Sequence, residues 1–206
     1  MIWWNIRGIN NSDKRLRVKQ QLDSSQDEIL LLQETKLSNE NYHKTVQGWP
    51  KWHSAHSQSL GASGGLATLW NPKTVIGQLV SQGPNWQLLS FQHYNLSFML
   101  FNIYGPSSIV GKARLWQQLS DMFQGFQDQN IILGGDFNAI TSLHEKKGGI
   151  FPPSKTMEDF GAFINDNDLF DVIPSKGTFT WNNKREGFCQ IVERLDRFLV
   201  SPSWKL

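Results

Sequence analysis

Runs of consecutive apolar residues recur along the chain and predict buried strands. Residues 28–33 form one such run, which is typical of a strand covered on both faces. A second run, at residues 131–133, passes through two glycines directly into Asp136, Phe137 and Asn138. The same reading predicts strands at residues 2–6, 64–70, 86–91, 97–104, 179–183 and 193–200, and residues 86–104 as a hairpin.

Helical spacing of apolar residues separates several of these strands. Residues 14–22, 113–126 and 156–167 each show this spacing. In the middle segment it forms one stripe, which indicates core packing: Leu115, Trp116, Leu119, Met122 and Phe123. Strands and helices are mixed without the strict rhythm of a parallel sheet. The order therefore predicts an α/β sandwich with helices packed outside the sheets.

Composition and charge narrow the class of protein. With 206 residues, 39% of them hydrophobic, the chain can bury a core, and we expect one globular domain over residues 1–206. The formal charge of +2 is too small to indicate a polyanion-binding protein by itself. Basic residues gather in two places, each of which could also be an ordinary solvated surface: Lys14, Arg15, Arg17 and Lys19, and then Lys184, Arg185, Arg194 and Arg197.

The single cysteine, Cys189, excludes an internal disulfide and thiolate zinc sites. It fits a reducing, intracellular compartment. No basic leader precedes the first strand, and no segment approaches the roughly 18 apolar residues of a membrane span. We therefore expect a protein with no membrane association.

Polar residues that can handle phosphate or a metal stand at the ends of the predicted strands. They are Asn5, Glu34, Tyr104, Asp136, Asn138, Thr180 and Asp196. Oxygen ligands of this kind favour Mg²⁺ or Mn²⁺ over zinc. The alternative for Asp136 and Asn138 is an ordinary strand that ends in an Asx turn.

Four short segments, in this order, resemble the endonuclease/exonuclease/phosphatase superfamily. They are Trp4-Asn5-Ile6-Arg7-Gly8, Leu32-Gln33-Glu34-Thr35-Lys36, Gly134-Gly135-Asp136-Phe137-Asn138 and Arg194-Leu195-Asp196-Arg197-Phe198. The chain is most similar to the endonuclease domain of plant LINE-type non-LTR retrotransposons. That likeness rests on segments 64–70, 102–106, 145–149 and 179–183. The resemblance implies a four-layered α/β sandwich that acts on DNA.

The resemblance also assigns roles to single residues. Glu34 would bind the divalent ion, with Asn5 beside it. Asp136 and Asn138 would orient the nucleophile and contact the scissile phosphate. Tyr104 would donate to a phosphate oxygen, Thr180 would touch the substrate backbone, and Asp196 would orient a histidine.

Some of these assignments have structural alternatives. Thr178 competes with Thr180, and the Tyr104 hydroxyl could simply reach water. Asp196 could be a structural partner of a neighbouring arginine. Arg7 stands where the abasic-site repair enzymes of the superfamily carry an aspartate, which argues against a dedicated repair nuclease.

The family's last motif, a Ser-Asp-His strand, has no counterpart in this sequence. The five histidines are His43, His53, His56, His93 and His144, and all fall in segments that do not match that motif. A missing proton-handling group costs about 10²–10⁴ in rate, so we expect an impaired, C-terminally truncated endonuclease domain without its last strands.

Two other functions stay open at this point. One is a phosphatase or phosphodiesterase of the same superfamily that acts on a small or lipid phosphate ester. The other is a non-catalytic remnant that binds nucleic acid. For the endonuclease we expect a monomer, a nuclear location, and a reverse transcriptase domain in the full-length parent.

Overall fold

The apolar run that predicted a strand near residue 30 forms β2 (Ile29–Gln33), all five residues of which are buried. The computed structural model describes residues 1–24, 28–59, 64–126 and 129–204. The chain divides into two units: Met1–Tyr104 with Ile132–Gly135, and Gly105–Ile131 with Asp136–Leu206. The architecture is a mixed α/β fold with two main sheets.

The first sheet belongs to unit 1 and has the strand order β1-β2-β4-β3. Its other members are β1 (Ile2–Asn5), β3 (His53–Ser57) and β4 (Leu66–Trp70). Helix α1 (Ser12–Ser24) connects β1 to the parallel strand β2, while β4 pairs antiparallel with both of its neighbours. Asn5 is the register partner of Gln33, so the ends of β1 and β2 lie at one edge of the sheet.

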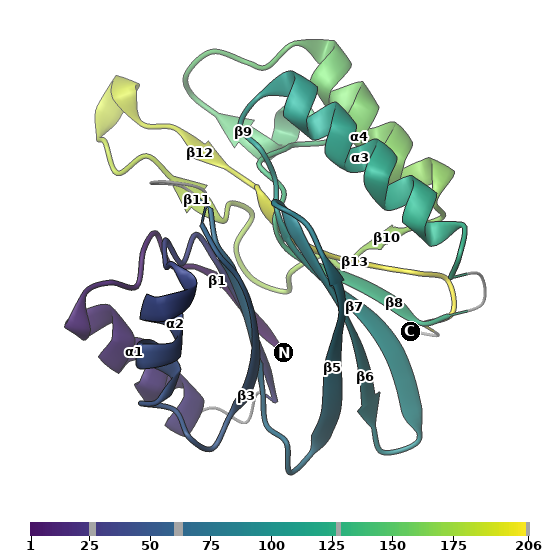
Figure 1. Cartoon of the computed structure of the whole chain (residues 1–206). Helices are drawn as coiled ribbons and strands as arrows, with labels where there is room; N and C mark the ends of the chain where they lie inside the picture. The colour runs from purple at the N-terminus through teal and green to yellow at the C-terminus, as the bar shows by residue number, and fades with distance from the viewer. Residues whose placement is uncertain (25–27, 60–63, 127–128, 205–206) are drawn as a thin grey trace. The chain divides into compact units, whose positions relative to one another are not determined.

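Two helices accompany this sheet in unit 1, α1 and α2 (Asn39–Val46), as Figure 1 shows. Val18 and Leu22 of α1 and Tyr42 of α2 are buried in one apolar cluster with alternate residues of β2 and β4. This alternation is the reason for the continuous apolar run in β2, since the other half of its side chains faces away from the helices.

The second sheet contributes β5 (Val75–Gln82), β6 (Trp86–His93) and β7 (Leu96–Tyr104) to unit 1. They continue in the order β8-β7-β6-β5, where β8 (Ile131–Asp136) has its central residues in unit 1 and its ends in unit 2. A bulge interrupts the β5–β6 register between Leu79 and Ser81. Most of β5 is exposed, as suits a strand at the edge of a sheet.

Helices α3 (Ile109–Phe123) and α4 (Ser154–Asp166) are the main elements of unit 2. Trp116 of α3 stacks on Phe160 and Phe163 of α4, with ring centroids 4.8 and 5.1 Å away. The remaining elements are short: η1 (Leu143–Glu145), β9 (Lys146–Lys147), β10 (Phe170–Asp171), β11 (Trp181–Asn182), η2 (Gly187–Cys189), β12 (Val192–Glu193) and β13 (Asp196–Val200). The strands among them form a small sheet, β11-β12-β9, and an antiparallel β10–β13 pair.

The predicted helices and most predicted strands are confirmed, with shifted ends. The strand predicted over residues 193–200 is interrupted, because Arg194 and Leu195 bond to partners outside any sheet: Arg194 N–H donates to the Glu145 carbonyl, and Leu195 N–H to the Thr180 hydroxyl. The segment 179–183 is strand only at Trp181–Asn182. Within the described residues, no helix is both long and apolar enough to cross a membrane.

Candidate functional site

Glu34 follows β2 directly, and its carboxylate is held by a tyrosine. The hydroxyl of Tyr104, the last residue of β7, donates to Glu34 Oε1 at 2.6 Å. Glu34 has a φ of 53°, in the left-handed region that a glutamate rarely adopts. Such conformations are enriched at functional sites. Both residues were predicted site residues, and the structure brings them together.

The backbone around Glu34 is fixed by neighbouring loops. Gly8 N–H donates to the Glu34 carbonyl at 2.6 Å, and the N–H groups of Thr35 and Lys36 donate to carbonyls of Gly65 and Gly64 at 3.0 and 3.1 Å. These three bonds hold the residues on both sides of the carboxylate, and they compensate for its unfavourable φ.

A series of side-chain hydrogen bonds starts at Gln33, the residue before Glu34, and links the two sheets of unit 1. Gln33 donates to Asn102 Oδ1 at 2.7 Å, Asn102 donates to Thr68 Oγ1 at 3.1 Å, and Thr68 donates to Gln87 Oε1 at 2.9 Å. All four residues are fully buried. Because a buried amide is costly to leave unpaired, this chain fixes the register of β2 relative to β7.

Asn5, at the end of β1, lies at the same sheet edge as Glu34. Its Oδ1 accepts from Arg7 N–H at 3.2 Å. Lys14 from α1 donates to the carbonyls of Ile6 and Arg7 at 2.8 Å each, so this lysine supports the loop after β1. One member of the first basic cluster therefore has a structural role.

The donors at this edge fit a magnesium ion. Glu34 supplies a half-buried carboxylate, one oxygen of which is oriented by Tyr104, and Asn5 supplies an amide oxygen. Within the described ranges, no group of three or more His, Cys, Asp or Glu could hold a metal. Mg²⁺ commonly uses one or two protein carboxylates and completes its shell with water and substrate phosphate, so this donor set suits it.

In unit 2, Asp136 and Asn138 form a tight polar turn at the end of β8. Asp136 is only 4% exposed, and its Oδ1 accepts from Asn138 N–H at 2.9 Å. Asn138 Nδ2 donates to the Gly105 carbonyl at 2.7 Å, and Gly105 N–H donates to the Asp136 carbonyl at 2.7 Å. A Cβ at Gly105 would lie 2.1 Å from the Phe137 carbonyl oxygen, so only glycine allows this close approach. The Asx turn considered as an alternative is therefore present, within a wider network.

Lys112 of α3 is a candidate that the sequence did not reveal. It lines a cavity of about 150 Å³ together with Asn138 and Glu193. Burial lowers the pKa of Lys112, and the charges of Glu193 and Asp136 oppose that shift. A lysine at an otherwise ordinary helical position carries no local signal, so only the packing of α3 identifies it.

Thr180 and Asp196 also lie together in unit 2. The Thr180 hydroxyl oxygen accepts from the N–H groups of Leu195 and Asp196, at 3.0 Å each. Thr180 therefore fixes the backbone that carries Asp196, which is 7% exposed. The hydrogen of the Thr180 hydroxyl can still donate to a substrate oxygen.

The arginines beside Asp196 form their ion pairs elsewhere. Arg194 donates to Glu145 Oε1 at 3.0 Å and to Asp171 Oδ1 at 2.7 Å, and Arg197 donates to the same two carboxylates. Burial alone would raise the pKa of Glu145, but hydrogen bonds and charge from Arg197, aided by Thr141 N–H and Arg194, lower it to about 2. Half of the second basic cluster is thus a buried ion cluster of Glu145, Asp171, Arg194 and Arg197.

The sequence profile of the endonuclease/exonuclease/phosphatase family matches residues 2–206. No curated protein sequence matches the chain.

Solved structures agree with the family match at the level of the fold. The endonuclease domain of TRAS1, a telomere-specific non-LTR retrotransposon, aligns with a TM-score of 0.70 at 14% identity, covering 98% of this chain and 84% of that one. The catalytic domain of Xenopus laevis APE2 aligns with a TM-score of 0.72 at 18% identity, covering 98% and 81%. The 3′-5′ exonuclease NExo from Neisseria meningitidis gives 0.67 at 18% identity, covering 98% and 86%.

Proposed function

The chain belongs to the endonuclease/exonuclease/phosphatase family, and we propose that it hydrolyses phosphodiester bonds of DNA with Mg²⁺ or Mn²⁺ as cofactor. The single observation that carries this proposal is the carboxylate of Glu34, held by the Tyr104 hydroxyl at the end of a buried strand. A surface glutamate needs no such support, whereas a metal ligand must be oriented.

The bound ion would supply positive charge that offsets charge developing on the phosphate oxygens. Glu34 would hold it, with Asn5 beside it. Asp136 would accept a hydrogen bond from the attacking water and orient its oxygen, while Asn138 would contact the scissile phosphate. In hydrolysis, the water oxygen bonds to phosphorus and loses a proton to solvent, while the bond from phosphorus to one ester oxygen breaks and that oxygen keeps the bonding electrons and takes up a proton.

We propose that turnover by the 206-residue chain is slow. In related enzymes a histidine handles the proton of the attacking water, and this sequence has no Ser-Asp-His triplet. Asp196 would then orient no imidazole. The expected rate is about 10²–10⁴ below that of an enzyme with a positioned base.

The finer assignment is a nicking endonuclease of the retrotransposon type, with the four-layered sandwich of its family and residues 1–206 as a single domain. Two facts support it: the likeness in fold to the TRAS1 endonuclease domain, and the Glu145-Lys146-Lys147-Gly148-Gly149 segment. DNA would be the substrate and a reverse transcriptase domain the covalent partner in a full-length parent. We expect the chain to act as a monomer in the nucleus.

The test is conversion of supercoiled plasmid to nicked circle with Mg²⁺ or Mn²⁺. We expect slow nicking by the wild-type chain, and its loss in Glu34→Gln and in Asp136→Asn. Glu186→Gln, an exposed position in unit 2, is the matched control and should nick at the wild-type rate. A folded wild-type protein that never nicks, or site variants that nick as fast as the control, would overturn the proposal.

A further inference from the structure

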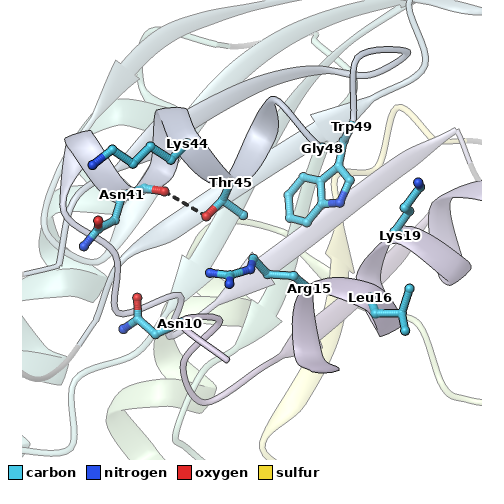
Figure 2. A pocket seen from close by; sticks show the side chains of 9 residues that line it. All are labelled: Asn10, Arg15, Leu16, Lys19, Asn41, Lys44, Thr45, Gly48 and Trp49. Atoms are coloured by element: carbon cyan, nitrogen blue, oxygen red, sulfur yellow. Dashed lines mark hydrogen bonds between the residues drawn. The ribbon is translucent and has the colours of Figure 1, made fainter. Parts of the chain in front are cut away.

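A cationic groove between helices α1 and α2 lies in unit 1, and none of the predicted site residues lines it. Its volume is about 630 Å³. The residues that line it are Asn10, Arg15, Leu16, Lys19, Asn41, Lys44, Thr45, Gly48 and Trp49 (Figure 2). They include three cations and no carboxylate, so the groove suits an anionic ligand.

Two of the cations, Arg15 and Lys19, come from the first basic cluster, and neither has a role in the hydrolytic site. Arg15 and Lys19 are four residues apart on α1, which is about 6 Å along the helix axis, and they project on the same side. Within the described part of the chain, no ion pair includes either of them. Their charge is available to a ligand.

The third cation contributes less. Lys44 of α2 pairs with Glu40 at 2.6 Å, and its side chain is 67% exposed. In Figure 2 it lies at the opposite end of the groove from Lys19. The strongest positive charge is therefore on the α1 wall, while the side-chain amides of Asn10 and Asn41 add uncharged hydrogen-bond donors.

Apolar surface lies among these cations. Leu16 is 55% exposed between Arg15 and Lys19 in the sequence, and the indole of Trp49, which is 5% exposed, borders the groove. A small inorganic anion has no apolar surface that could contact the exposed leucine. In a single strand of nucleic acid, however, sugars and bases are free to contact apolar side chains while the phosphates contact the cations.

We propose that this groove binds a single strand of nucleic acid, through phosphate contacts to Arg15 and Lys19 and an apolar contact to Leu16. The binding does not require hydrolysis and is separate from the roles of Glu34 and Asp136. The groove volume of about 630 Å³ leaves room for more than one phosphate, as a strand requires.

The test measures fluorescence anisotropy of a labelled 20-nucleotide single-stranded DNA in EDTA, over 25–200 mM NaCl. Each phosphate contact on a single strand adds about −0.7 to the slope of log K against log salt. Arg15→Ala with Lys19→Ala should therefore make the slope shallower by about 1.4, which corresponds to about 25-fold weaker binding at 0.1 M salt. The pair Arg15→Lys with Lys19→Arg should retain the wild-type slope.

Arg17→Ala with Lys73→Ala is the matched control, since it removes the same charge from exposed positions of unit 1 outside the groove. It should leave the slope unchanged. Leu16→Ser should weaken binding of the single strand at an unchanged slope and leave binding of duplex DNA of the same sequence unaffected. Equal losses in the groove and control variants, or a Leu16→Ser effect on duplex equal to that on the single strand, would overturn the proposal. Because EDTA prevents turnover, neither outcome bears on the proposed hydrolysis.

Discussion

Replacing Glu145 with glutamine should destabilise unit 2 by an amount that depends on pH. Glu145 is 9% exposed and accepts hydrogen bonds from both arginines of the ion cluster, as well as from Thr141 N–H at 2.7 Å. The Arg197 side chain is fully buried, so a neutral partner leaves part of its charge uncompensated.

Two lines of reasoning give a similar size for this effect. Removing one partner of a buried ion pair typically costs about 3–5 kcal/mol. The fall in the pKa of Glu145 from 4.5 to about 2 gives about 3 kcal/mol, at about 1.4 kcal/mol for each tenfold change in proton affinity. For a chain of this length, about 3 kcal/mol lowers the melting temperature by about 10 °C.

The sign of the pH dependence follows from the lowered pKa. The unfolded carboxyl binds a proton near pH 4.5, whereas the folded one does so only near pH 2, so the stabilisation is complete above pH 4.5 and is lost as pH falls toward 2. Urea unfolding of wild type and Glu145→Gln at pH 7, 5, 4 and 3 should show the difference between them shrinking below pH 4.5. Glu158→Gln, exposed on α4, should change stability by less than about 0.5 kcal/mol. A constant difference between Glu145→Gln and wild type at all four values would refute this reasoning.

Three further changes test other parts of the molecule. Tyr104→Phe removes the hydrogen bond to Glu34, which is worth about 1.5–3 kcal/mol for a charged acceptor, so plasmid nicking should slow about 10–100-fold. A change under threefold would contradict the role of Tyr104 in orienting Glu34. Burial and a nearby histidine lower the pKa of His56 from 6.5 to about 4. The full shift corresponds to about 3 kcal/mol, and because His56 is only partly buried, solvent screening reduces the expected loss of wild-type stability to about 2 kcal/mol as pH falls from 6.5 toward 4. Urea unfolding of His56→Phe should show a flatter pH profile, and identical profiles would exclude His56 as the cause. Gly135→Ala would place a Cβ 2.1 Å from a carbonyl oxygen of β7 and should lower the free energy of unfolding by about 3 kcal/mol. The control is Gly161→Ala on α4, where a Cβ meets nothing within 4 Å. Equal unfolding midpoints for the two variants would contradict the clash.

The sequence predicted the strands that are buried on both faces and missed those whose burial depends on partners. β2 is a continuous apolar run, and local pattern suffices to identify it. β3 is His53-Ser54-Ala55-His56-Ser57, and the hydroxyl of its buried Ser57 bonds to Gln82 and Gln87, from strands farther along the chain. β5 is largely exposed, so hydrophobicity does not mark it. Long-range pairing therefore decided both strands.

The residues of the candidate site likewise fall into those that local sequence identifies and those that depend on long-range packing. Glu34 and Asp136 could be identified because each is a charged residue at the end of an apolar strand, where a merely solvated position is not expected. Lys112 was missed because its role depends on the packing of α3. The pairing of Glu145 with Arg197, 52 residues apart, also has no local signal: the sequence shows Glu145 only within a short motif, and Arg197 within another motif and a basic cluster.

The glycines at positions 64 and 65 connect backbone conformation to the proposed chemistry. The sequence places them at the start of a strand, but the strand begins at Leu66, and both glycines lie before it with positive φ. In that conformation their carbonyls accept the N–H groups of the two residues after Glu34. A Cβ on Gly65 would lie 2.4 Å from Thr35 Oγ1, so a larger residue would displace this segment. The glycines thus maintain the left-handed backbone of Glu34, and with it the direction in which its carboxylate meets the Tyr104 hydroxyl.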